Sequence, residues 1–166
     1  MNGLRILPVA LVLLSLVGAA PALADDPIAV PAPVPSPTPG EEGAAQLIRG
    51  DVAKAVAAYT LALKDTGLPN DRRAAILNDR AVGNVRLGET KAALDDYNRA
   101  IELFPEYPVA YNNRGNLLLA LGQLGEAIKD FDRALALAPG YAAAYSNRGN
   151  AKMRIGKSDE ALADFT

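Results

Sequence analysis

The chain contains no cysteine, no histidine and no tryptophan among its 166 residues. Without cysteine it can form no disulfide, thiolate metal site or cysteine nucleophile, and it offers no cysteine for a bacterial lipid anchor. Without histidine it lacks the imidazole base and the commonest protein ligand of zinc and haem. Catalysis by Asp, Glu, Lys or Tyr stays open in principle, but the composition predicts a protein that is not an enzyme and needs no metal or cofactor.

An excess of charge of one sign is also missing. The net charge is −2 at pH 7, so the chain has no long-range attraction for nucleic acid or for an anionic bilayer. The glycine-rich patterns that bind phosphate, GxxxxGKS or GxxxxGKT and GxGxxG, are absent too. We therefore expect no nucleic-acid ligand, and a protein or peptide is the partner class that remains.

The N-terminal segment, residues 1–24, differs in kind from the rest. Arg5 gives a short positive start, and residues 6–17 are apolar apart from one proline and one serine. Ala22-Leu23-Ala24 then matches the small-x-small pattern that signal peptidase cleaves. A membrane anchor, the alternative, needs a longer apolar run than this one, which Gly18 and Pro21 interrupt. We expect a bacterial-type signal peptide over residues 1–24, and an exported protein, periplasmic or secreted, with no membrane span after cleavage.

Residues 25–40 are rich in proline. Six prolines fall in this segment, and each fixes φ and removes an amide donor, so we expect neither helix nor strand there. The composition predicts a disordered or polyproline II linker between the signal peptide and the folded region. A proline-rich docking motif is the alternative, and the spacer interpretation is favoured.

The most informative feature is an internal repeat. The sequence from Tyr111 to Asn116 returns, with one substitution, as Tyr145 to Asn150. The two copies are 34 residues apart, from 111 to 145. Self-similarity at a fixed period of this length predicts a stack of repeated units rather than one globular core. The units run over residues 74–107, 108–141 and 142–166, with an irregular unit at about 41–73, so that residues 41–166 form one repeat domain.

Each unit contains two amphipathic stretches separated by a glycine. A glycine at that place suits a left-handed helix C-cap. Pro105 and Pro139 close the second stretches, and Pro108 suits the first position of a helix. The four glycines are Gly50, Gly88, Gly122 and Gly156. The sequence therefore predicts an all-α fold of antiparallel helix pairs.

Small and large side chains occupy fixed positions of the repeat, counted from the start of each unit. Small side chains let two helix axes approach, and aromatic rings fill the space above them. The small residues are Ala81, Gly115 and Gly149 at position 8, Ala55, Ala93, Ala127 and Ala161 at position 20, and Ala62, Ala100 and Ala134 at position 27. The large ones are Leu77, Tyr111 and Tyr145 at position 4, and Tyr59, Tyr97, Phe131 and Phe165 at position 24. We interpret these aromatic residues as core, not as a ligand cage.

This pattern resembles the tetratricopeptide repeat family. Units of that family carry an aromatic residue or Leu at position 4, Gly or Ala at 8, Ala at 20, an aromatic residue at 24, Ala at 27 and Pro at 32. The match covers residues 74–141 in full and 142–166 as far as the sequence extends, whereas residues 41–69 match only in their second helix. The resemblance implies a right-handed α-solenoid that binds a protein or peptide in its concave groove.

An arginine at position 7 departs from the family pattern, in which Leu is frequent there. The arginine occurs in the units that begin at residues 74, 108 and 142, and in each of them an aspartate follows at position 23. Positions 7 and 23 lie equally far from the turn, so antiparallel helices bring them side by side. The predicted pairs are Arg80–Asp96, Arg114–Asp130 and Arg148–Asp164, against the alternative that the side chains are separately solvated. The first unit has Glu42 and Ala58 instead and lacks the pair.

The resemblance also implies which residues line the groove, because first helices contribute positions 2, 5, 6, 9, 12 and 13 to it. Carried over by position, the candidate protein-binding residues are Asn78, Asp79, Arg86, Asn112, Asn113, Asn116, Asn147, Asn150 and Arg154. A primary amide both donates and accepts hydrogen bonds, so recurring asparagines suit the capture of an extended peptide backbone. The alternative is that asparagine there only reflects the common sequence of the repeat.

One subset of the family clamps an acidic C-terminal carboxylate with basic groups at positions such as 2 and 5. Position 2 holds Ala75, Val109 and Ala143 here, and no Lys occupies position 5, so this mode is disfavoured. The main prediction is an exported, non-catalytic scaffold or adaptor. The last unit stops at Thr166, short of a complete second helix, and we expect the chain to be a fragment. A solenoid that self-associates through this unit, and the N-terminal recruitment part of a larger envelope protein or enzyme, stay open as alternatives.

Overall fold

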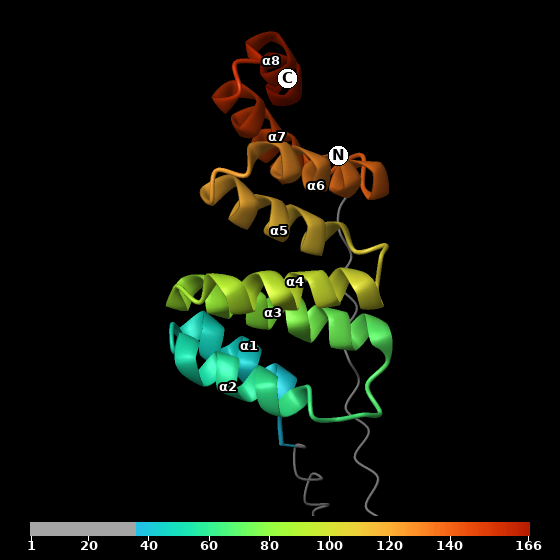
Figure 1. The fold of residues 1–166 in the computed structure, drawn as a ribbon. Coiled ribbons are helices and arrows are strands. Elements are labelled where there is room, and N and C mark those ends of the chain that lie inside the picture. Colours follow the sequence, from blue (N-terminus) through green and yellow to red (C-terminus); the bar gives the residue numbers. More distant parts are fainter. Residues whose placement is uncertain (1–35) are drawn as a thin grey trace, which may run out of the picture. The chain divides into compact units, whose positions relative to one another are not determined.

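The computed structural model describes residues 36–166, and this part of the chain consists of α-helices joined by short turns, without a strand. The helices, labelled in Figure 1, are α1 (Pro39–Arg49), α2 (Val52–Ala62), α3 (Asn70–Leu87), α4 (Thr90–Leu103), α5 (Pro108–Ala120), α6 (Leu124–Leu137), α7 (Ala142–Arg154) and α8 (Ser158–Phe165). The predicted all-α class is confirmed for these residues. The predicted signal peptide (1–24) and residues 25–35 of the predicted linker lie outside the described residues. Among helices α1 to α8, none has the length and apolar character that a membrane crossing requires.

The helices pack in successive pairs, and each pair also contacts the next one along the chain. A glycine with positive φ closes the first helix of every pair: Gly50 (86°), Gly88 (79°), Gly122 (78°) and Gly156 (81°). A side chain is strained in this left-handed conformation, which explains the recurrence of glycine. Helix α5 begins at Pro108, and α4 and α6 end just before Pro105 and Pro139. The predicted helix boundaries of these units are confirmed.

The start of α1 corrects one prediction. The proline content of residues 25–40 predicts no helix there, yet α1 begins at Pro39. Thr38 Oγ1 accepts a hydrogen bond from the Glu41 amide (3.3 Å), and the Glu41 carboxylate accepts one from the Thr38 amide (2.8 Å). Proline costs nothing at the first helical position, because the amide there has no partner within the helix. The first unit therefore contains a complete helix pair.

Helix α3 carries an extra turn at its N-terminal end, ahead of Ala74. From this turn Arg73 reaches back over the connection that follows α2. Its Nη1 donates to the Leu63 carbonyl (3.1 Å) and its Nη2 to the Asp65 carbonyl (2.6 Å). The connection between the first two units thus consists of a loop held by Arg73 and an added turn of α3.

Aromatic residues at position 24 fill the space that small residues at position 8 leave free. A Cβ added to Gly115 would lie 2.7 Å from the Phe131 ring, and one added to Gly149 would lie 2.5 Å from the Phe165 ring. Gly43 has the same relation to Tyr59, at 2.6 Å. In these three pairs the close approach of the helices therefore depends on the missing side chain. The core interpretation is confirmed for the buried rings of Tyr59, Tyr97 and Phe131, whereas Phe165 is 48% exposed.

The predicted arginine–aspartate pairs are present in all three units. Each guanidinium donates through Nε and Nη2 to both oxygens of its aspartate, at 2.8 and 2.6 Å for Arg80–Asp96 and 2.7 and 2.7 Å for Arg114–Asp130. In Arg148–Asp164 the distances are 2.9 and 2.5 Å. Such a bidentate pair fixes the orientation of the two side chains as well as their separation. It therefore sets the register of the two helices in each unit.

The remaining donor of each arginine contacts the preceding unit, which the sequence analysis missed. Nη1 of Arg114 donates to Asn98 Oδ1 (2.7 Å), and Nη1 of Arg148 donates to Asp132 Oδ1 (2.6 Å). Arg80 makes the equivalent bond to Thr60 Oγ1 (3.2 Å). All three acceptors occupy position 25 of the unit before, so one side chain ties three helices together.

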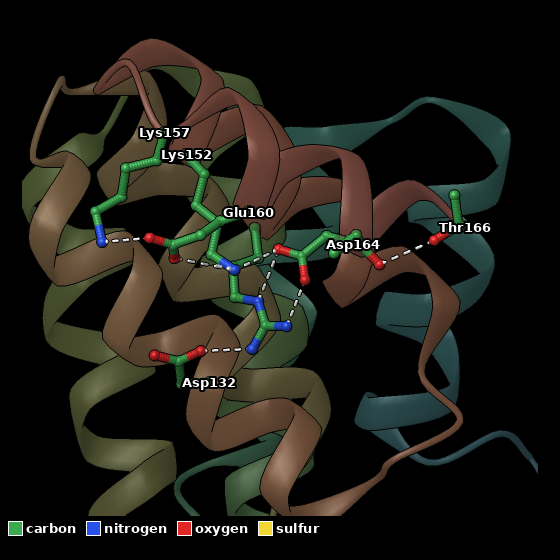
Figure 2. A network of polar contacts seen from close by, with 8 residues as sticks. Asp132, Lys152, Lys157, Glu160, Asp164 and Thr166 are labelled. Atoms are coloured by element: carbon green, nitrogen blue, oxygen red, sulfur yellow. Dashed lines mark hydrogen bonds and ion pairs between the residues drawn. The ribbon is translucent and has the colours of Figure 1, made fainter.

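The network is largest in the last unit, which Figure 2 shows. Lys152 Nζ lies 2.9 Å from Asp164 Oδ2 and 3.7 Å from Glu160 Oε2, beside the Arg148 contacts. The bond from Arg148 holds the pKa of Asp164 below its usual value, against the effect of burial, and Lys152 lowers it further. Asp164 is therefore an ionised partner of two cations.

We expect Phe131→Ala to lower the free energy of unfolding by about 3–5 kcal/mol, because the buried ring leaves a cavity. Phe165→Ala removes the same group from the same repeat position, but Phe165 is 48% exposed whereas Phe131 is 0% exposed. Its cost should be clearly smaller. Urea denaturation followed by far-UV circular dichroism measures both, and equal losses would contradict the packing described here.

For the Arg114–Asp130 pair we expect a double-mutant cycle with alanine to give a coupling energy of about 1–3 kcal/mol, since the pair is bidentate and mostly buried. The exposed pair Arg99–Glu102, with both side chains 63% exposed, serves as the control. Its coupling should stay below about 0.5 kcal/mol. Similar couplings for the two pairs in urea denaturation would count against a special role for the arginine at position 7.

Candidate functional site

The nine predicted protein-binding residues lie on three first helices that neighbour one another. We call their surface the first-helix face; it consists of Asn78, Asp79 and Arg86 on α3, Asn112, Asn113 and Asn116 on α5, and Asn147, Asn150 and Arg154 on α7. Helix α3 contacts α5, and α5 contacts α7. The repeat therefore brings equivalent residues of successive units side by side.

Asparagine side chains connect these helices directly. Asn113 Nδ2 donates to Asn78 Oδ1 at 3.0 Å, and Asn147 Nδ2 donates to Asn112 Oδ1 at 2.9 Å. In each case the position 6 asparagine of one unit bonds the position 5 asparagine of the unit before it. We call these two contacts the asparagine bridges. They show that the recurrence of asparagine has a structural cause within the stack.

The predicted site contains buried, half-buried and exposed residues. Asn78 and Asn112 are only 3% and 4% exposed, and their side-chain oxygens are occupied by the asparagine bridges. Since their amide groups also donate to the next residue, at 3.1 Å to Asp79 and 3.5 Å to Asn113, little of either side chain is free for a partner. Their contact with a partner stays a prediction.

The exposed members of the first-helix face are Arg86, Asn116, Asn150 and Arg154. Arg86 and Asn116 border a shallow pocket of ≈ 280 Å³ between α3 and α5, together with apolar Val82, Val85 and Leu117. Arg154 Nη1 donates to the Leu119 carbonyl (2.7 Å) and so crosses from α7 to α5. The pocket lining thus combines apolar side chains with a cation and a primary amide.

Asp79 is the one carboxylate of the first-helix face, and it is partly buried. Burial raises the pKa of Asp79, and the hydrogen bond from Asn78 only partly opposes this effect. Its charge in turn adds to burial in raising the pKa of Tyr59 to about 12 and that of Tyr97 further still. Ionisation of Asp79 therefore lowers the stability of the fold.

A second cavity, of ≈ 570 Å³, lies where α1, α2 and the start of α3 meet, and sequence reasoning missed it. Gly40, Tyr59, Leu61, Ile76 and Asp79 are among its lining residues. The available signal was Gly40, which stands where later units carry asparagine. The alignment that puts Glu42 at position 7 already puts Gly40 at position 5, but the sequence does not show that the space left there stays open.

Two family models match the chain in the region of clearest repetition. The tetratricopeptide repeat model matches residues 108–141, and a second model described as TPR repeat matches residues 85–122. Among solved structures, the second TPR of Spaghetti (RPAP3) bound to an HSP90 peptide is 31% identical and has a TM-score of 0.56. The match covers 58% of this chain and 89% of that one. The chain belongs to the tetratricopeptide repeat family.

Other TPR structures resemble this TPR chain over a larger share of its length. A crystal structure of MamA is 25% identical with a TM-score of 0.69, covering 76% of this chain and 72% of that chain. The first TPR domain of the human RPAP3 protein is 27% identical with a TM-score of 0.66, covering 74% and 93%. None of the curated proteins compared with the chain matches it. The helix pairs of residues 36–166 are thus TPR units of a solenoid type.

We expect Asp79→Asn to raise the melting temperature of the TPR chain at neutral pH, because the substitution removes a partly buried charge. Burial raises the pKa of Asp79 above its unfolded value, so the ionised form destabilises the fold. This cost is full above the folded pKa and vanishes below the unfolded one. The difference between variant and wild type should therefore shrink as the pH falls, whereas a constant difference from pH 7 down to acid would contradict it.

Proposed function

We propose that this TPR chain is a non-catalytic scaffold that binds an extended segment of a partner protein on its first-helix face. The proposal includes export through the signal peptide expected at residues 1–24, to the periplasm or the exterior. It also includes the continuation of the units into a right-handed α-solenoid whose concave groove contains the first-helix face.

The pocket between α3 and α5 is the observation that carries the proposal. Arg86 and Asn116 are exposed at its edge, and neither has a side-chain hydrogen bond to another residue of 36–166. Val82, Val85 and Leu117 give an apolar surface between them. Free hydrogen-bond donors beside apolar side chains suit a peptide, because its backbone carbonyls accept hydrogen bonds and its side chains bury apolar area.

Peptide binding by related TPR domains supports the proposal. The second TPR of Spaghetti (RPAP3) is described as bound to the HSP90 peptide SRMEEVD, and the second TPR domain of human RPAP3 is described as in complex with the HSP70 peptide SGPTIEEVD. These peptides are acidic at their C-terminal ends. Ala75, Val109 and Ala143 at position 2 supply no cation for such an end, so an internal extended segment is the better fit.

Self-association is the second candidate, and an exposed apolar surface on α8 favours it. Leu162 is 64% exposed and Phe165 is 48% exposed. Side chains of this kind pack against another unit in a TPR stack, and a second copy of the chain could supply that unit. The remaining alternative is that this chain is the N-terminal recruitment part of a larger envelope protein or enzyme. In that role it would use the same first-helix face.

The test is capture of a partner by the immobilised full chain from an extract of the source cells, with quantification by mass spectrometry. We expect Arg86→Ala combined with Asn116→Ala to reduce capture of the partner at least about tenfold, since an arginine at the centre of an interface contributes about 2 kcal/mol or more. Arg99→Ala serves as the control: it removes the same charge from an exposed position on α4 and should leave capture unchanged.

Retention of the same partner by the double variant would reject the first-helix face as the binding surface. The synthetic peptide SRMEEVD provides a further arm, in which we expect no measurable binding. Light scattering of the full chain separates the two candidates: a monomer at high concentration argues against self-association, and a dimer that Leu162→Ser abolishes supports it.

A further inference from the structure

The first helix pair can be placed in register with the others through its glycine contact. Gly43 meets the Tyr59 ring as Gly115 meets the Phe131 ring, so these two glycines are equivalent. Gly40 precedes Gly43 by the same interval that separates Asn112 from Gly115. Gly40 therefore stands at position 5 of the first unit, where the next two units carry Asn78 and Asn112.

Asp79 occupies the position that would bond to residue 40 if this junction had an asparagine bridge. It occupies position 6 of the second unit, where the later units carry Asn113 and Asn147, the donors of the asparagine bridges. Between the first and second units a glycine thus faces a carboxylate. Glycine has no side chain and an ionised carboxylate has no donor, so the asparagine bridge has no counterpart at this junction.

The cavity of ≈ 570 Å³ opens at this place, and both Gly40 and Asp79 line it. Its size falls within the range of small-ligand sites, about 300–1,000 Å³. Its apolar lining comes from Leu61, Leu68 and Ile76. Its charged lining residues are Glu41, Asp65, Asp79 and Arg72, so negative charge is in excess.

Asp79 also differs from the other buried or partly buried aspartates in having no cation. Asp96, Asp130 and Asp164 are each bound by an arginine. Within residues 36–166, the only hydrogen bond that the Asp79 side chain accepts comes from Asn78, at its Oδ1 (3.1 Å), and no ion pair reaches it. Arg72, the cation among the lining residues, makes no ion pair in the same part of the chain. A carboxylate whose Oδ2 has no hydrogen-bond partner among residues 36–166 thus lines a mostly apolar cavity.

We propose that this cavity receives the side chain of an Arg or Lys residue from the partner segment, with Asp79 as its counter-ion. The cationic group would donate to Asp79 at the place where an asparagine bridge joins later units, and its aliphatic stem would lie against Leu61, Leu68 and Ile76. The inference rests on the proposed binding of an extended segment to the first-helix face and adds a specificity site at its N-terminal end.

The test uses a set of synthetic peptides with acetylated and amidated ends, in which Arg, Lys, Gln or Glu stands at the centre of the constant sequence ASLxLSA. Each is titrated into the full chain and followed by the amide NMR signals of Gly40, Asp79 and Asn116. We expect the Arg and Lys peptides to bind at least about tenfold more tightly than the Gln peptide, with shifts at Gly40 and Asp79, because a charge-assisted bond adds about this much.

Two variants separate charge from space. Asp79→Asn keeps the shape of the side chain and should abolish the preference for Arg over Gln. Gly40→Asn should fill the cavity and weaken binding of the Arg peptide about tenfold or more, without altering the charge of the site. A Cβ at residue 40 has neighbours no nearer than 3.7 Å, so this variant fits the fold. Gly125→Ala, where no atom lies within 4 Å of an added Cβ, is the control for substitution of a helical glycine.

Equal binding of the Arg and Gln peptides, no binding of either cationic peptide, or a preference that survives Asp79→Asn would overturn the inference. Binding of methylguanidinium alone as tightly as the Arg peptide would also overturn it, because a partner segment would then add nothing. Partner capture that depends on Arg86 and Asn116 but not on Asp79 would leave the proposed function in place while rejecting this site.

Discussion

The arginine at position 7 is the side chain on which the geometry of the stack depends. Its guanidinium has donors in a fixed planar fork, and in Arg114 they reach Asp130 in the same unit and Asn98 in the unit before. The pair within the unit sets the register of two helices, and the third bond sets the next unit against them. In the three units that carry the pair, the small residue at position 8 and the ring at position 24 pack in that register, whereas the first unit brings Gly43 against the Tyr59 ring without it. Lysine could not replace the arginine, because a single ammonium lacks the fork.

The helix pairs and their internal contacts could be predicted from the sequence because they are local. The constant repeat period, glycines at the turns, and an arginine at position 7 with an aspartate at position 23 specify positions related by one hairpin, and the structure confirms them. The contacts between units could not be predicted in the same way. Nothing in the sequence shows that Arg148 reaches Asp132, or that Asn147 reaches Asn112, until the stacking of one hairpin on the next is known.

The candidate site shows the same division. Position within the repeat correctly placed the nine residues on neighbouring first helices, but it could not separate those that face solvent from those that face the adjoining unit. Asn78 and Asn112 are buried because the next helix lies against them, whereas Asn116 lies farther along its helix and stays exposed. The missing asparagine bridge between the first two units could not be predicted for another reason. Pro39 and Gly40 resemble a linker in composition, although Thr38 and Glu41 have the Thr-x-x-Glu spacing of a capping box, whose two bonds the structure shows.

The bonds between units share a direction. Among residues 36–166, every side-chain hydrogen bond from one unit to another has its donor on the later unit and its acceptor on the earlier one, as in Arg80 to Thr60, Asn113 to Asn78 and Arg154 to Leu119. A ribosome synthesises the acceptors first, since chains grow from the N-terminus. Each hairpin can therefore dock on the surface of the units before it, without any contribution from the units that follow.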